Sequence, residues 1–218
     1  MPRTRIKICG VRDQRTAEQA ADAGADAIGL DLRPGARCHV DAHLAADILT
    51  ALPPFMTAVA VYADPTLDDF LDAEAICPAP YTQLHGREPE NLVRRIGPDA
   101  IKTILYTPTT IDADLRLWSK VEEVCAVLVE APPGANWEEL APRLARSIKL
   151  SPLRIILAGG LTPENAGPVI AAARPWGVSV SAGVESAPGV KDPARIAAFC
   201  RAVRAADAGG AGGVGGVR

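Results

Sequence analysis

The sequence predicts a single α/β domain, a (β/α)8 TIM barrel, from three observations. Strand-like and helix-like segments alternate along the whole chain and make eight strand–helix units. Expected strands such as IILAGG and AVLVEA are almost entirely apolar, which is typical of parallel strands covered by helices. A length of 218 residues suits one barrel, whereas a doubly wound sheet usually has roughly five to seven strands.

The elements follow one another in a regular order. The first strand begins with the alternating apolar residues Ile6 and Ile8, and Gly24 closes the first helix, as glycine commonly does. We expect strands at residues 5–10, 25–32, 56–63, 81–86, 100–107, 125–131, 154–161 and 177–185. We expect helices at residues 14–24, 41–52, 66–75, 89–97, 113–124, 136–148, 162–174 and 192–206. The barrel domain is predicted to cover residues 1–208, followed by a Gly-rich, disordered tail at 209–218.

Composition excludes several classes of protein. A net charge of −3 provides no basic surface for nucleic acid, and we expect no nucleic-acid partner. The chain has no apolar run of about 18 residues and no signal-like N-terminus, so we expect a cytoplasmic protein without membrane contact. The five cysteines are odd in number, widely spaced and without a CxxC pair, which favours free thiols over disulfides or a metal site.

In a barrel of this type, functional side chains lie at the carboxyl ends of the strands. Several of the residues at the expected strand ends can carry a proton, and the last two units contain glycine turns. The sequence therefore predicts an active site at this end of the barrel. The strand-end residues are Cys9, Asp31, Tyr62, Gln83, His85, Tyr106, Glu130, Gly159, Gly160, Ser181 and Gly183.

The turns LAGGLTPEN and VSAGVESAPGVKD predict a phosphate site. Barrels commonly bind phosphate on the loops after strands seven and eight, through backbone N–H groups and a helix N-terminus. Gly159, Gly160 and Gly183 would let the backbone approach a phosphate closely, and Ser181 can donate its hydroxyl. The alternative is that these residues form ordinary tight turns.

Other candidates each have a functional and a structural interpretation. Cys9 is a candidate base, although free cysteines often only fill space in a core. Glu130 ends an apolar strand, where an unpaired carboxyl would favour its neutral form and act as an acid, unless an Arg or Lys pairs with it. Gln83 and His85 offer polar contacts, and Arg37 lies in a loop that can reach an anion.

Five segments resemble the phosphoribosylanthranilate isomerase family of tryptophan biosynthesis, in the same order as in that family. They are KICG at 7–10, GADAIGL at 24–30, QLHG at 83–86, ILAGGLTPEN at 156–165 and SAGVESAPGVKD at 181–192. The resemblance covers roughly residues 5–204. It implies a (β/α)8 barrel that needs no cofactor or metal and catalyses the Amadori rearrangement of an aminoaldose phosphate to an aminoketose phosphate. A small phosphorylated molecule is the implied substrate.

The resemblance also implies roles for individual residues. Cys9 would be the general base that takes the proton from C2 of the sugar, and Glu130 stands where the family has its general acid, which protonates the ring oxygen. The residues expected to contact the rest of the substrate are Arg37, Gln83, His85 and Ser179. Those expected to bind the phosphate are Gly159, Gly160, Ser181, Ala182 and Gly183.

The chain departs from the family pattern near the acid. Glu130 replaces an Asp, and a displacement of about 1 Å can cost on the order of a hundredfold in rate. The segment APPGANW keeps Trp137 but puts Pro132 and Pro133 where the family has a flexible glycine loop.

Other departures lie in strand eight and the second loop. Ser179 replaces a carboxylate, Ala182 replaces a serine, and GARCHV keeps Arg37 but has Cys38 in place of a tyrosine. These changes leave two alternatives to the isomerase open. One is a diverged paralogue acting on another substrate in a specialised pathway, and the other is a non-catalytic barrel that binds a phosphorylated ligand.

Overall fold

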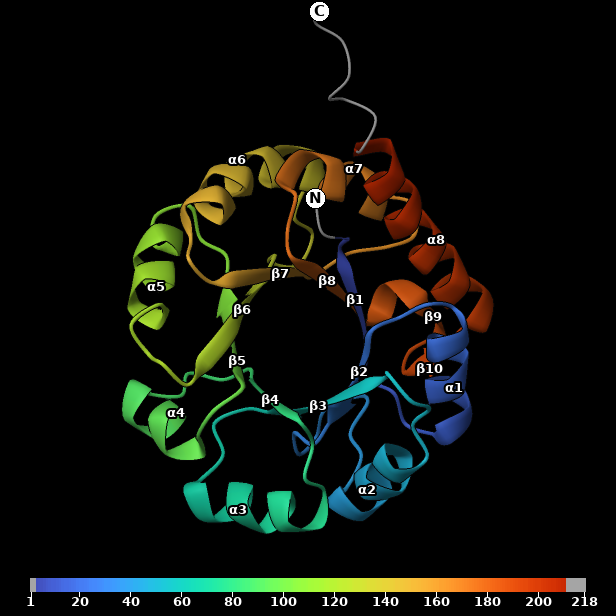
Figure 1. Ribbon diagram of the computed structural model, residues 1–218, viewed down its shortest axis with the longest axis vertical. Helices are drawn as coiled ribbons and strands as arrows, with labels where there is room; N and C mark the ends of the chain where they lie inside the picture. The colour runs from blue at the N-terminus through green and yellow to red at the C-terminus, as the bar shows by residue number, and fades with distance from the viewer. Residues whose placement is uncertain (1–2, 211–218) are drawn as a thin grey trace, which may run out of the picture.

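The structure, a computed structural model, describes residues 3–210 and confirms the predicted (β/α)8 barrel. Eight parallel strands close into a barrel in the order β1 to β8, and a ring of helices surrounds them (Figure 1). The strands are β1 (Arg5–Cys9), β2 (Ala27–Asp31), β3 (Thr57–Tyr62), β4 (Tyr81–Leu84), β5 (Ala100–Leu105), β6 (Val124–Glu130), β7 (Arg154–Ala158) and β8 (Gly177–Val180). The helices are α1 (Gln14–Asp22), α2 (Ala42–Thr50), α3 (Leu67–Ile76), α4 (Glu90–Ile96), α5 (Ile111–Trp118), α6 (Trp137–Leu150), α7 (Ala166–Ala173) and α8 (Pro193–Gly210).

The C-terminal segment belongs partly to the last helix. Helix α8 includes residues 209 and 210, the first two of the expected tail, and residues 211–218 lie outside the described part of the chain. Within residues 3–210, no helix combines the length and apolar character that crossing a membrane requires.

The barrel closes because β1 pairs with strands on both of its sides. Lys7 lies opposite Ala27 of β2 and opposite Ser179 of β8, in parallel register. Since all eight strands run in the same direction, their carboxyl ends meet at one rim. The residues predicted from the strand ends are therefore brought together at this rim.

Polar caps begin several of the outer helices. Asp13 accepts a hydrogen bond from the backbone N–H of Thr16 at 2.8 Å, and Asp41 accepts one from that of Leu44 at 2.9 Å. Such caps satisfy N–H groups that have no partner within the helix.

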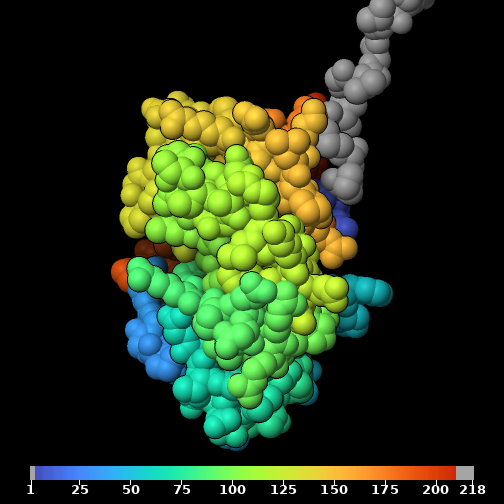
Figure 2. All heavy atoms as spheres, turned by 90° about the vertical axis from the view of Figure 1, so that its left-hand side faces the viewer, coloured from blue at the N-terminus to red at the C-terminus, as the bar shows by residue number. Residues whose placement is uncertain are grey.

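Figure 2 shows one side of the molecule, where the segments from teal through green to yellow form a continuous outer layer.

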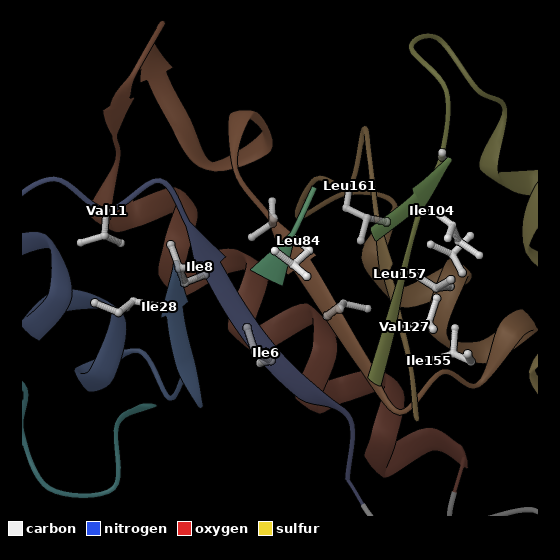
Figure 3. Packing of buried hydrophobic residues seen from close by; sticks show 14 of the residues in the cluster. Ile6, Ile8, Val11, Ile28, Leu84, Ile104, Val127, Ile155, Leu157 and Leu161 are labelled. Carbon is white, nitrogen blue, oxygen red and sulfur yellow. The ribbon is translucent and has the colours of Figure 1, made fainter. Parts of the chain in front are cut away.

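Apolar side chains pack in two separate layers. Alternate strand residues such as Ile6, Ile8 and Leu157 point outward and are buried under the helices (Figure 3). A smaller group fills part of the barrel interior: Val59, Ile101, Ala126, Leu128, Ile156 and Ala158. The remaining interior positions include the buried polar residues Lys7, Gln83, Thr103 and Ser179. The interior of the barrel is therefore partly polar beneath the carboxyl-end rim.

Two element boundaries differ by five residues or more from the sequence-based expectation. The helix expected at 113–124 is wrong at its end, because α5 stops at Trp118 and Val124 pairs with Ala100 as the first residue of β6. The strand expected at 177–185 ends at Val180 and is followed by a 3-10 turn at Ala182–Val184. Two short strands, β9 (Glu185–Ala187) and β10 (Val190–Lys191), then form an antiparallel hairpin that was not predicted.

One buried ion pair lies between the barrel and the helices. Lys102 of β5 donates to Glu88 at 2.6 Å, and both side chains are almost fully buried. Burial would raise the pKa of Glu88, but hydrogen bonds from Lys102 and from the N–H group of Asp64 hold this pKa below its usual value. The charge of the buried Lys102 is thus balanced by the carboxylate of Glu88.

Candidate active site

A cavity of about 600 Å³ opens at the carboxyl ends of the barrel strands. The structure brings every residue predicted for the site into its lining, although they come from distant parts of the chain. These residues are Cys9, Arg37, Gln83, His85, Glu130, Gly159, Gly160, Ser179, Ser181, Ala182 and Gly183.

Two strand-end residues do not belong to this lining. Tyr62 packs edge-on against Phe70 of α3, with 5.2 Å between the ring centroids, and lies in the outer core. Burial raises the pKa of Tyr62 far above its ordinary value, and its place in the outer core separates its hydroxyl from the cavity. Tyr106 also lies outside the set of lining residues.

Cys9 lies at the end of β1, half-buried and facing the cavity. Gly10, with φ +75°, turns the backbone away directly after it. Gly29 on the neighbouring strand leaves space for the thiol, since a Cβ there would come within 2.6 Å of Cys9 Sγ. The Nζ atom of Lys7 lies 3.4 Å from the same sulfur. The thiol is thus exposed to the cavity on one side and faces an ammonium on the other.

Glu130, at the end of β6, has a partner. His85 Nε2 lies 3.2 Å from Glu130 Oε2, and the glutamate side chain is about one-third exposed (34%). The expectation of an unpartnered carboxyl in an apolar setting is therefore wrong, and the partner is a histidine rather than the Arg or Lys that was considered. Both groups lie within the cavity lining.

The charge state of His85 follows from its surroundings. Burial lowers the pKa of His85 below its ordinary value, and the nearby cations Arg33 and Lys7 lower it further, although Glu130 acts in the opposite direction. The imidazole is therefore neutral near pH 7. A neutral ring donates from one nitrogen and accepts at the other. With the proton on Nε2, the N–H group lies on the side of Glu130, with 3.2 Å between Nε2 and Oε2, and Nδ1 accepts from Gln83 Nε2 at 3.4 Å.

Gln83 connects His85 to the centre of the barrel. Its Nε2 also donates to Thr103 Oγ1 at 3.0 Å, and its Oε1 accepts from Lys7 Nζ at 2.5 Å. Gln83, Thr103 and Lys7 are all buried. Hydrogen bonds thus connect His85 through Gln83 to Lys7, which contacts Cys9, and Glu130 lies against His85 at the other end.

Sequence reasoning missed three basic residues of this region. Lys7 precedes Cys9 by two positions on the same face of β1, and this period-two spacing was the available signal. Arg33 lines the cavity and binds both oxygens of Asp31 at 2.8 Å, an interaction that raises the pKa of Arg33. Arg195 lines the cavity near the last turn, and its Nε donates to Gly183 O at 3.1 Å.

The predicted phosphate turns lie against each other. Gly159 and Gly160 adopt φ of +88° and +63°, and a Cβ at Gly159 would lie 2.4 Å from the carbonyl oxygen of Ala131. A Cβ at Gly183 would lie 1.8 Å from that of Leu161, so this position requires glycine. The two turns therefore form one compact backbone surface at the edge of the cavity.

Neighbouring side chains anchor this surface. Trp137 Nε1 donates to Gly159 O at 2.8 Å, so the tryptophan kept in APPGANW holds the turn after β7 in place. Lys191 donates to Ser181 Oγ at 3.0 Å and to Glu185 Oε1 at 2.8 Å. Arg37, about half exposed, lies 3.3 Å from Glu185 Oε2. Cationic groups thus surround the turn that follows β8.

Comparison with known proteins gives one consistent result. Residues 6–202 match the family described as N-(5'phosphoribosyl)anthranilate (PRA) isomerase. The N-(5'-phosphoribosyl)anthranilate isomerase of Moorella thermoacetica is 37% identical over 209 residues, covering 92% of this chain and 89% of the relative. That of Acidithiobacillus ferrooxidans is 38% identical over 214 residues, covering 94% of this chain and 99% of the relative.

Solved structures lead to the same family. The phosphoribosylanthranilate isomerase of Thermotoga maritima has a TM-score of 0.80 and 29% identity, and the similarity covers 93% of this chain and 99% of that chain. A phosphoribosylanthranilate isomerase in complex with reduced 1-(o-carboxyphenylamino)-1-deoxyribulose 5-phosphate has a TM-score of 0.79, with the same identity and coverage. These relatives do not favour the diverged paralogue or the non-catalytic barrel. This chain belongs to the N-(5'-phosphoribosyl)anthranilate isomerase family.

Proposed function

We propose that this protein converts N-(5'-phosphoribosyl)anthranilate to 1-(o-carboxyphenylamino)-1-deoxyribulose 5-phosphate in the cytoplasm, as a step of tryptophan biosynthesis. The observation that carries the proposal is that the thiol of Cys9 and the carboxyl of Glu130 flank one cavity, which also contains the compact glycine turns. A related isomerase with a reduced form of this product bound supports the identity of the ligand.

The reaction moves protons within one molecule and needs no external oxidant or reductant. Glu130 donates a proton to the ring oxygen, the ring opens, and the nitrogen lone pair forms a C1=N bond. Cys9, as thiolate, then removes the proton from C2. The C2–H electron pair forms a C1=C2 bond while the π pair of C1=N returns to the nitrogen. Transfer of the proton from the Cys9 thiol to C1, and loss of the C2 hydroxyl proton to the Glu130 carboxylate, give the ketone and restore both groups, so C1 is reduced as C2 is oxidised.

His85 assists the acid in this scheme. When Glu130 gives up its proton it becomes a carboxylate, and neutral His85, whose Nε2 lies 3.2 Å from Oε2, is the neighbouring group that can donate to it. A hydrogen bond to the charged form stabilises that form, which favours proton release at the moment of ring opening. Before the ring opens, the carboxyl proton of Glu130 can lie on Oε1, the oxygen that does not face His85.

The charge of the lining suits a substrate with two anionic ends. Arg33, Arg37 and Arg195 line the cavity, and Arg195 lies beside the turn at Gly183. We assign the phosphate to the backbone of residues 159–160 and 181–183. Arg33, close to the reacting groups, is then placed for the anthranilate carboxylate, because guanidinium groups bind carboxylates well.

The first prediction concerns Cys9. The wild-type protein should convert phosphoribosylanthranilate and rescue a tryptophan auxotroph that lacks this isomerase. Cys9→Ser should lower turnover by about a hundredfold to ten-thousandfold, because an alcohol is a far poorer base than a thiolate. Cys125→Ser is the matched control, since Cys125 lies outside the cavity lining, at the other end of β6. Normal turnover in Cys9→Ser would exclude the thiol as the base.

The second prediction concerns Glu130. Glu130→Gln should lower turnover by about a hundredfold or more, because an amide of the same shape cannot donate a carboxylic proton. Glu130→Asp keeps the acid but withdraws it by one methylene, so its loss should be smaller than that of the amide. The exposed Glu122→Gln serves as control. Equal activity of Glu130→Gln and wild type, measured as initial rates, would remove Glu130 from the mechanism.

The third prediction concerns pH. Because the pKa of His85 is lowered below its ordinary value of 6.5, the unfolded chain binds this proton first as the pH falls. The stability that the folded protein gains from holding His85 neutral is fully present above pH 6.5. It is lost as the pH falls through the lowered pKa of His85 in the folded protein. The unfolding free energy of His85→Gln should therefore decrease less between about pH 7.5 and 5.5 than that of wild type. Urea unfolding measures this slope, and His43→Gln, at an exposed site, should not change it. An unchanged slope in His85→Gln would show that His85 is not held neutral.

A further inference from the structure

We propose that Lys7 is a positioning residue whose ammonium pairs with Cys9 and keeps the sulfur in its thiolate form. This inference rests on the proposed function only where it connects the thiolate of Cys9 with turnover of the substrate. The pair itself can be tested without substrate.

The geometry places ammonium and sulfur together inside the barrel. Lys7 is 5% exposed, and its Nζ lies 3.4 Å from Cys9 Sγ. Both side chains occupy space that a residue larger than glycine on β2 would fill, since a Cβ at Gly29 would lie 2.9 Å from Lys7 Cε and 2.6 Å from Cys9 Sγ. Glycine at this position is therefore what allows the contact.

A buried ammonium requires compensation, and Lys7 has no carboxylate to provide it. Among residues 3–210, no Asp or Glu oxygen lies within 4.0 Å of its Nζ. Its other partner is the neutral Gln83, at 2.5 Å. Lys102, the buried lysine on the outer side of the barrel, differs because it is paired with Glu88. An unpaired buried charge is costly, so Lys7 needs an anion from another source.

The residue opposite Lys7 is Ser179, which supplies no charge to pair with the ammonium. Ser179 of β8 pairs with Lys7 in the barrel register and is buried in the same interior. A serine hydroxyl carries no charge near neutral pH. In this chain, Cys9 is thus the group beside Lys7 that can become an anion.

The other charged groups facing this point have partners of their own. Asp31 is bound by Arg33 at 2.8 Å through both of its oxygens, and Glu130 contacts His85. His85 is neutral for the reasons given above. Asp31 is therefore not free to neutralise Lys7, and Glu130, as the protonated acid of the proposed reaction, carries no charge that could do so. A cation within contact distance favours a thiolate, which is the form that acts as base.

Alkylation by iodoacetamide, followed by peptide mass spectrometry, measures the thiolate at each cysteine. Burial raises the pKa of Cys38, Cys77, Cys125 and Cys200, and these four thiols are internal controls that should react slowly near pH 7. Cys9 should react fastest in the wild-type protein. Lys7→Met should slow its alkylation at pH 7 by about tenfold or more, and Lys7→Arg should restore most of the rate, because it restores the cation.

The variant Ser179→Asp tests the pairing of Lys7 with Cys9 while the lysine is kept. The new carboxylate should take Lys7 as its partner and also slow Cys9 alkylation, and this variant decides the question if Lys7→Met does not fold. Wild-type alkylation rates at Cys9 in Ser179→Asp, or in a folded Lys7→Met, would overturn the proposal. A protein with Lys7-dependent Cys9 reactivity but no turnover of phosphoribosylanthranilate would overturn the proposed function and leave this inference standing.

Discussion

Closure of the barrel between β1 and β8 is the constraint on which the site depends. Because the chain's first strand pairs with its last, residues near the two ends of the sequence share one interior. The parallel register places Lys7 opposite Ser179 and brings Cys9 close to the turn at 181–183. A shift of one residue in β1 would turn Lys7 and Cys9 outward under the helices and bring Ile6 and Ile8 inside. The apolar contacts of those isoleucines with the surrounding helices therefore help to hold the polar site in register.

Charge pairing divides the interior into separate units. Asp31 is paired with Arg33, and Glu185 is paired with Lys191 and Arg37, whereas the acid Glu130 lies against the uncharged His85. Lys191 draws down the pKa of Glu185 against the opposing effect of burial, so that pair stays charged beside the phosphate turn. Each carboxylate near the cavity thus has a local partner, and the ammonium of Lys7 is left facing the thiol.

Much of this arrangement follows from the sequence, for a physical reason. In a parallel barrel the order of strands determines which ends meet, so strand-end residues such as Cys9, Glu130 and Gly160 could be assigned to one cavity. Partners could not be assigned in the same way. The contact of Glu130 with His85 depends on side-chain direction across two strands, and that of Arg33 with Asp31 depends on loop geometry. The end of α5 was also missed, because pairing of Val124 with β5 overrides the helical character of residues 119–124.

A structure of this protein with reduced 1-(o-carboxyphenylamino)-1-deoxyribulose 5-phosphate bound would show whether Cys9 and Glu130 flank the reacting atoms. The phosphate should lie on the backbone of residues 159–160 and 181–183. C2 of the sugar should lie within about 4 Å of Cys9 Sγ, a contact distance. The C4 oxygen, which derives from the ring oxygen of the substrate, should lie within hydrogen-bond distance of Glu130. A phosphate bound elsewhere, or a ligand with C2 against Glu130 and far from Cys9, would contradict the account.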